Sequence, residues 1–319
     1  MSIAADQIAW YERRRATKSR ASAAAKSTAT IAAASGKAHT GPEHIEAGAA
    51  ASIRRVSEPP AIVCSTISVF SKPIDEAFGL IAGAGFDGIE IMVTRDPDTQ
   101  DGRRIRELSE DHRLPVAAIH APFLLMTRRV WGADPVGKIG HALEFARDVG
   151  APLVIVHPPY RWQRGYRRWL DDRPPEPAGE LPAVAVENMF PLRVRGRAVG
   201  TFHAGQSLED LDLAAKVVLD TSHAAVAGLD LVDAVDRLGD RLVHVHLSNN
   251  AGKGWDSHLP LDQGILDLGR FLEALAARGF GGAVSLEIDL RSYLDDDEAL
   301  RRILVRNRAL CAERLGLAA

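Results

Sequence analysis

The stretch Val217-Val218-Leu219-Asp220-Thr221-Ser222-His223 decides how the rest of this 319-residue sequence is interpreted. Three apolar residues end abruptly in a carboxylate, and an imidazole follows three positions later. A buried parallel strand has this pattern where its carboxyl end opens into a site, because a charged side chain is tolerated only where the strand leaves the core. The stretch therefore predicts a parallel strand with functional residues at its end.

From residue 61 onward, short apolar runs alternate with amphipathic stretches, as strands and helices do around a parallel sheet. The eight predicted strands are 61–69, 88–93, 115–121, 152–157, 183–187, 216–220, 242–247 and 283–288. The predicted helices lie near 73–83, 101–113, 135–149, 207–214, 229–239, 267–278 and 297–315. Eight such units in about 260 residues have the size of a (β/α)8 TIM barrel, which is the predicted α/β fold.

Residues 1–58 differ in composition from the rest of the chain. They are rich in Ala, Ser and Arg and poor in the aromatic and branched residues that bury a face. We expect a largely disordered extension here, followed by the barrel over 59–319; a transit peptide is the alternative. The extension holds nine Lys and Arg against five Asp and Glu, which leaves the barrel with 30 basic and 37 acidic residues. An acidic barrel makes nucleic acid a less favoured partner.

Cys64 and Cys311 lie far apart and form no metal-binding or redox spacing. This pattern predicts two buried thiols in a reducing compartment, and hence a cytoplasmic location. No apolar run approaches the roughly 18 to 20 residues that cross a bilayer, so a membrane is not an expected partner. The sequence does not indicate an oligomeric state.

Polar residues gather at or just after the carboxyl ends of the predicted strands. In a TIM barrel these ends converge on one face, so residues far apart in sequence become neighbours. Five imidazoles and four carboxylates have this placement: His120, His157, Glu187, Asp220, His223, His246, Asp256, His258 and Glu287. Burying several carboxylates together costs many kcal/mol unless they are protonated, paired or bound to metal, and few Lys or Arg stand near these positions. The pattern predicts a site for a divalent metal such as Zn, Mn, Fe or Co.

Single residues around this set have two interpretations each. His244 shares a strand face with His246 one layer deeper, which favours a supporting or core histidine. Glu90 ends the second strand and either contacts substrate or makes a structural hydrogen bond. The loop 160–169 interleaves basic and aromatic residues, so Arg161, Trp162 and Arg164 are predicted substrate contacts. The alternative for this loop is an amphipathic segment packed on the barrel rim.

These motifs resemble those of the xylose isomerase-like TIM barrels, a superfamily that includes sugar isomerases, sugar epimerases and the endonuclease IV family of AP endonucleases. The resemblance covers residues 61 to about 315, in accord with the barrel size given above. It rests on Ile119–Phe123, Val156-His157-Pro158, Val186-Glu187-Asn188, Leu219–His223, His246-Leu247-Ser248, Asp256-Ser257-His258 and Leu286-Glu287.

Each branch of the superfamily implies a different metal content. Similarity to the epimerases implies one metal, held by Glu187, Asp220, His246 and Glu287. Similarity to the endonucleases implies three zinc ions and uses all nine residues. The first ion would take His120, His157 and Glu187; the second would take Glu187 as a bridge, with Asp220, His246 and Glu287; the third would take His223, Asp256 and His258.

Two chemistries follow from this resemblance. In an isomerase or epimerase, the single Zn or Mn ion chelates a hydroxy-carbonyl while Glu187 and Glu287 move the proton and His223 orients a substrate oxygen. The predicted cofactor is thus a divalent metal, Zn or Mn, with one to three ions across the two branches. In a zinc-dependent phosphodiesterase of the endonuclease IV type, the metals activate water against a phosphodiester. The nine-residue set favours the phosphodiesterase, whereas the acidic barrel favours a small sugar or sugar-phosphate substrate. Isomerase or epimerase activity is therefore the predicted function. A metal-binding barrel without catalysis is a third, less favoured class.

Overall fold

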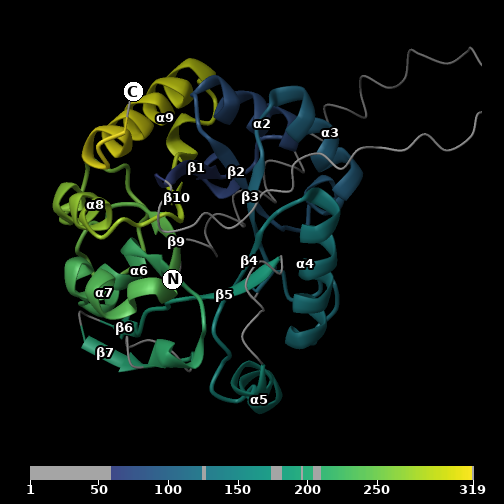
Figure 1. The fold of residues 1–319 in the computed structure, drawn as a ribbon, viewed down its shortest axis with the longest axis vertical. Helices are drawn as coiled ribbons and strands as arrows, with labels where there is room; N and C mark the ends of the chain where they lie inside the picture. Colours follow the sequence, from purple (N-terminus) through teal and green to yellow (C-terminus); the bar gives the residue numbers. More distant parts are fainter. Residues whose placement is uncertain (1–58, 124–126, 174–181, 195–196, 204–209, 318–319) are drawn as a thin grey trace, which may run out of the picture. The chain divides into compact units, whose positions relative to one another are not determined.

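The computed structural model describes residues 59–123, 127–173, 182–194, 197–203 and 210–317 (Figure 1). Within them, eight parallel strands form a closed barrel in the order β1-β10-β9-β8-β5-β4-β3-β2. The strands are β1 (Ala61–Ser65), β2 (Gly88–Met92), β3 (Val116–His120), β4 (Leu153–Val156), β5 (Ala183–Glu187), β8 (Val217–Asp220), β9 (Leu242–Leu247) and β10 (Ala283–Leu286). The predicted TIM barrel is therefore confirmed, and each of the eight predicted strand ranges contains one barrel strand.

Helices follow the strands and pack on the outside of the barrel (Figure 1). They are α2 (Ile74–Gly83), α3 (Gly102–His112), α4 (Pro135–Val149), α5 (Arg164–Asp172), α6 (Thr221–Ala227), α7 (Leu231–Leu238), α8 (Leu268–Ala277) and α9 (Asp297–Arg314). Many begin at an aspartate whose side chain accepts a hydrogen bond from a backbone amide of the first turn, as Asp134 does for α4 and Asp296 for α9. These caps fix where each helix starts relative to the preceding strand.

The core has the two layers expected of this architecture. The barrel interior and the contact between barrel and helices are filled by branched side chains, and all residues of β1, β2 and β5 are buried. Ile155 of β4 and Val218 of β8 belong to one buried cluster in which small side chains such as Ala185 also take part. A barrel packed in this way is rigid, so residues at the strand ends are held in fixed positions.

Strand register determines which polar side chains face one another. Asp220 at the end of β8 is the ladder partner of His246 on β9, and His246 is in turn the partner of Ser285 on β10. Paired residues of parallel strands point to the same side of the sheet, so these side chains share the inside of the barrel. The register thus places a carboxylate beside an imidazole at the carboxyl end.

Some elements differ from the predictions. The described part of the predicted helix 207–214 is a short 3-10 turn, Asp210–Leu213. Helix α5 forms where a loop was expected, and a hairpin of β6 (Leu192–Val194) and β7 (Arg197–Gly200) follows β5. Helix α6 begins directly after Asp220, which caps it. The extension predicted over 1–58 lies outside the described residues.

Cys64 and Cys311 are both buried free thiols, as predicted. Burial raises the pKa of the Cys64 thiol to about 12, so it stays protonated. Among the helices in the described part of the chain, none has the length and hydrophobicity that crossing a membrane requires.

Candidate metal centre

Glu187 is the centre of the candidate site. It is the last residue of β5, is buried, and its carboxylate lies between imidazoles that come from other strand ends. Oε2 is 3.2 Å from His120 Nε2 and 3.3 Å from His157 Nε2, while Oε1 is 3.2 Å from both His223 Nδ1 and His246 Nδ1. Residues from five consecutive strands of the barrel or the segments just after them therefore meet at one carboxylate.

The first predicted ligand set, His120, His157 and Glu187, is assembled with its donor atoms within 4.8 Å of one another. His120 Nδ1 is 3.1 Å from the carbonyl oxygen of Ala121, which can only accept a hydrogen bond. Nδ1 therefore donates to this carbonyl oxygen, which leaves Nε2 as the ring nitrogen that faces Glu187, where a metal ion could replace the Nε2 proton. A backbone carbonyl that fixes the tautomer in this way is typical of histidines that bind metal.

The second predicted set combines carboxylates with His246. Donor atoms of Glu187, Asp220 and His246 lie within 4.8 Å of one another, and Glu287 Oε2 is 3.3 Å from His246 Nδ1. Asp220 Oδ1 accepts the backbone amide of His223, but buried Asp220 Oδ2 and Glu287 Oε2 accept no hydrogen bond from any residue that the structure describes. Buried carboxylate oxygens without a partner are costly, and a divalent cation between them would remove this cost. The donor set thus fits a metal ion.

The third predicted set is also brought together. Asp256 Oδ2 is 3.4 Å from His223 Nε2 and 2.7 Å from His258 Nε2, while Asp256 Oδ1 accepts a hydrogen bond from Ser222. His223 Nδ1 lies 2.9 Å from the carbonyl oxygen of Asn188, and this contact directs Nε2 towards Asp256. Asp220, His223 and His258 also have donor atoms within 4.8 Å of one another, so the second and third sets adjoin.

The electrostatics of this cluster follow from burial and from alternating charge. Burial alone would raise the pKa of Glu187, but the charge of His246 and the contacts with three further imidazoles hold it well below its usual range. Burial raises the pKa of Asp220 and of Glu287, and the charge of Glu187 adds to both effects. Burial would lower the pKa of His223, but Asp220 and Asp256 hold it well above its usual value. The cluster thus concentrates ionisable groups that compete for protons.

Glu90 is a fully buried neighbour of this cluster. It has no exposed surface, and its Oε2 is 2.8 Å from His244 Nε2 and 3.3 Å from His246 Nε2. Because His246 Nε2 faces Glu90, the Nδ1 atom is the one that faces Glu187 and Glu287. His244 is a buried, hydrogen-bonded histidine of the barrel interior, in line with the prediction of a supporting role.

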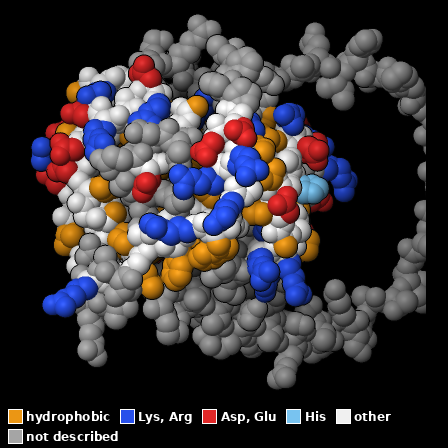
Figure 2. Space-filling view, turned by 90° about the horizontal axis from the view of Figure 1, so that it is seen from below, with side chains coloured by type: hydrophobic (Ala, Val, Ile, Leu, Met, Phe, Trp, Pro, Cys, Tyr) orange, Lys and Arg blue, Asp and Glu red, His pale blue; other side chains and the backbone are white. Residues whose placement is uncertain are grey.

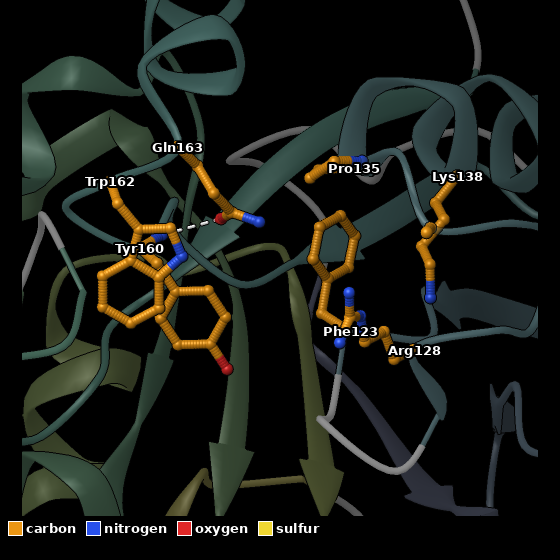
Figure 3. Close-up of a pocket in the computed structure, with 8 residues that line it drawn as sticks. Phe123, Arg128, Pro135, Lys138, Tyr160, Trp162 and Gln163 are labelled. Carbon is orange, nitrogen blue, oxygen red and sulfur yellow. Dashed lines mark hydrogen bonds between the residues drawn. The ribbon is translucent and has the colours of Figure 1, made fainter.

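The basic and aromatic loop after β4 leads into α5, on the lower side of Figure 1. Seen from below, Lys and Arg side chains stand next to hydrophobic ones on this face (Figure 2). Trp162 is 64% exposed and lines a pocket, whereas Arg161 and Arg164 are exposed and are not among the residues that line it. The pocket wall includes Arg128 and Lys138, which nothing in the sequence pattern connects with the strand ends (Figure 3).

His203 is a further residue that the sequence did not indicate. Its ring lies 6.2 Å from the ring of His157, and Nδ1 is 2.8 Å from the carbonyl oxygen of Pro158. Burial lowers the pKa of His203 to about 4, so the ring is neutral at physiological pH. It is brought to the site by the chain after the β6–β7 hairpin, and no strand pattern precedes it.

Comparison with known proteins agrees with this architecture. Residues 78–305 match the family described as xylose isomerase-like TIM barrel. An uncharacterized protein of Mycobacterium tuberculosis (strain ATCC 25618 / H37Rv) is 38% identical over 257 residues, which cover 73% of this chain and 90% of that protein.

Solved structures of two kinds share the fold. A D-tagatose 3-epimerase-like protein is 22% identical and superposes with a TM-score of 0.55, covering 76% of this chain and 97% of that chain. A family 2 AP endonuclease from Brucella melitensis is also 22% identical, with a TM-score of 0.55 over 73% of this chain and 94% of that chain. Both branches that the sequence motifs resemble are therefore represented. With its barrel, its strand-end residues and a match over residues 78–305, the chain belongs to the family of xylose isomerase-like TIM barrels.

Proposed function

We propose that this protein is a metal-dependent isomerase or epimerase that acts on a small sugar or sugar phosphate. The observation that carries the proposal is the pair of buried carboxylate oxygens, Asp220 Oδ2 and Glu287 Oε2, that accept no hydrogen bond from the described residues and face His246. A cation at this point would be held by Glu187, Asp220, His246 and Glu287. When bound, a Zn or Mn ion there would polarise the oxygens of a hydroxy-carbonyl substrate.

Glu187 and Glu287 are the proposed acid and base. They come from β5 and from the end of β10, which are not neighbours in the barrel, and each lies within 3.3 Å of His246 Nδ1. Two carboxylates that approach one point from separate strands can act on opposite faces of a substrate carbon. One takes the proton from the carbon beside the carbonyl group, and the other returns a proton to the opposite face. His223 orients a substrate oxygen, and the fold shared with a D-tagatose 3-epimerase-like protein supports the sugar class.

Glu90 has a supporting part in this proposal. In this proposal its carboxylate, 3.3 Å from His246 Nε2, holds the ring so that Nδ1 faces the other carboxylates. Carboxylates behind a histidine ligand commonly act in this way.

Exchange of substrate protons with solvent tests the proposed chemistry. The protein is incubated in D₂O with Mn or Zn and a panel of ketoses and ketose phosphates, and deuterium at carbon is followed by NMR. We expect incorporation beside the carbonyl group of at least one compound, and its loss in Glu187→Gln and Glu287→Gln. Glu144→Gln is the matched control, because Glu144 lies in α4 with a side chain that is 77% exposed. Full exchange in Glu187→Gln would refute the assignment of the site.

A zinc-dependent phosphodiesterase of the endonuclease IV type is the second candidate. The specific observation in its favour is the proximity of Asp256 to both His223 and His258, which completes a nine-residue set. Elemental analysis distinguishes the two: three tightly held zinc ions per chain would contradict a single-metal epimerase. Asp256→Ala should have a mild effect on isomerisation but abolish cleavage of an oligonucleotide with an abasic site. Failure of the parent protein to cut that oligonucleotide with zinc or manganese would exclude the repair activity.

A further inference from the structure

A cavity of about 390 Å³ lies beside the candidate metal centre, between the segments that follow β3 and β4. Its lining residues are Phe123, Arg128, Ala133, Pro135, Lys138, Tyr160, Trp162 and Gln163 (Figure 3). The volume lies within the range of small-molecule sites, which combine an apolar wall with a few polar groups. The cavity has both kinds of lining.

One wall is aromatic. The indole of Trp162 stacks on the ring of Tyr160 with their centroids 4.9 Å apart and their planes within 3°. Trp162 is 64% exposed, although tryptophan side chains are usually buried for the most part. Tyr160 covers one face of the indole, and an exposed aromatic face of this kind suits the C–H face of a sugar ring or chain.

The opposite wall carries positive charge (Figure 3). Lys138 is 4% exposed, and its Nζ donates to the carbonyl oxygens of Pro122 and Thr127 at 2.7 Å each. An ammonium group has three donors, so one remains for the cavity. Arg128 forms no ion pair with any residue in the described part of the chain, and the cavity has no acidic residue among those that line it. Two cations without a carboxylate make this end of the cavity suitable for an anion.

The cavity adjoins the candidate metal centre, because two residues of its lining contact histidines at or beside that centre. The Phe123 ring is 6.3 Å from the ring of His157, and the Tyr160 ring is 4.4 Å from that of His203. His157 is in turn one of the imidazoles on Glu187. The two sites are thus neighbours, and in our proposal a substrate with its reacting carbons at Glu187 extends its other end past Phe123 and Tyr160 towards the two cations.

We propose that this cavity binds the phosphate end of a phosphorylated sugar, with Arg128 and Lys138 holding the phosphate and Trp162 covering the carbon chain. This inference rests on the proposed isomerase or epimerase function and narrows its substrate class from sugars in general to sugar phosphates. In this arrangement the phosphate lies away from the candidate metal centre, so it contributes to binding and is not the reacting group.

Equilibrium binding tests the proposal without any turnover. Calorimetry on the full-length protein compares D-fructose 6-phosphate with D-fructose, and inorganic phosphate is the competing probe. We expect the phosphorylated sugar to bind at least about tenfold more tightly, which corresponds to about 1.4 kcal/mol, and inorganic phosphate to displace it. Arg128→Gln should reduce this preference to about twofold or less. Arg129→Gln is the matched control, because Arg129 is exposed like its neighbour Arg128 but does not line the cavity.

The outcomes separate this proposal from the proposed function. Equal affinity for the two sugars, or equal effects of Arg128→Gln and Arg129→Gln, would overturn the phosphate site even if ketoses exchange deuterium. A phosphate preference that depends on Arg128 would support the site even if no compound exchanges a proton, in which case the isomerase chemistry alone would fail. A sugar acid, D-gluconate, is the third ligand; binding as tight as that of the sugar phosphate would overturn the choice of phosphate over carboxylate.

Discussion

Asn249 offers a quantitative test of how the site is held together. It follows β9 and begins the segment that carries Asp256 and His258. Its buried side chain makes four hydrogen bonds with backbone groups: Oδ1 accepts the amides of Asn250 and Leu266, and Nδ2 donates to the carbonyl oxygens of Leu261 and Leu266. Asn249→Ala removes all four bonds and leaves their backbone partners in a buried region.

The expected cost follows from these contacts. A buried hydrogen bond contributes about 1 kcal/mol net, and leaving a partner unsatisfied costs about 1–3 kcal/mol. Because the segment can relax and admit water, we expect Asn249→Ala to lose about 2–4 kcal/mol of unfolding free energy. At about 2–4 °C per kcal/mol for domains of this size, the melting temperature should fall by about 4–16 °C.

Thermal unfolding followed by circular dichroism measures this loss. Asp262→Ala is the matched control, because Asp262 lies on the same segment and, among the described residues, forms an ion pair only with the 70% exposed Arg306. Surface ion pairs contribute about 0–1 kcal/mol, so the control should melt close to the parent protein. A melting temperature for Asn249→Ala that is no lower than that of Asp262→Ala would refute the proposed role of the Asn249 hydrogen bonds in holding this segment.

Three further predictions concern other parts of the barrel. Glu90→Gln should weaken binding of the proposed metal ion at His246 by about 10–100-fold, measured by competition with a chelator, and a change below about twofold would contradict the role of Glu90. Gly282→Ala should destabilise the protein by about 1–3 kcal/mol in denaturant unfolding, because the added methyl group would overlap the carbonyl oxygen of Val243. Gly140→Ala in α4 is the control: its methyl group meets nothing within 4 Å, so the change should be neutral or stabilising. In protein without metal, burial would lower the pKa of His258, but the charge of Asp256 outweighs this effect and raises the pKa to about 10, above the unfolded value of about 6.5. The stabilisation by this pair is therefore complete below about pH 6.5 and is lost as the pH rises towards 10, so the melting temperature of stripped protein should fall over that range more than that of His258→Gln.

The eight barrel strands were predictable because each is a short apolar run that is buried on both sides, and such runs leave a clear pattern in the sequence. Helix α5 was not predicted, because its residues Arg164–Asp172 are mostly polar and bury only Tyr166 and Leu170. The β6–β7 hairpin was missed for a related reason. Its strands are only three and four residues long, and it lies outside the repeating pattern of the barrel.

The nine strand-end residues were predictable because barrel topology alone brings the carboxyl ends together. Their detailed geometry was not, since the position of Glu187 between four imidazoles depends on strand register and on side-chain rotamers. The cavity could not be predicted from the sequence. Lys138 reaches it from the middle of a helix by donating to two loop carbonyls, and such contacts leave no trace in residue spacing.

The arrangement around Glu187 has a consequence for the dynamics of the barrel. The side chains that meet there come from the carboxyl ends of β3, β4, β5 and β9 and from the first turn of α6, which follows β8; these five strands are adjacent among the eight of the barrel. A ligand bound at Glu187 would connect the carboxyl ends of five of the eight barrel strands. Ligand binding should then slow amide hydrogen exchange at the carboxyl ends of these five strands together, while the exchange rates of β1 and β2 stay unchanged.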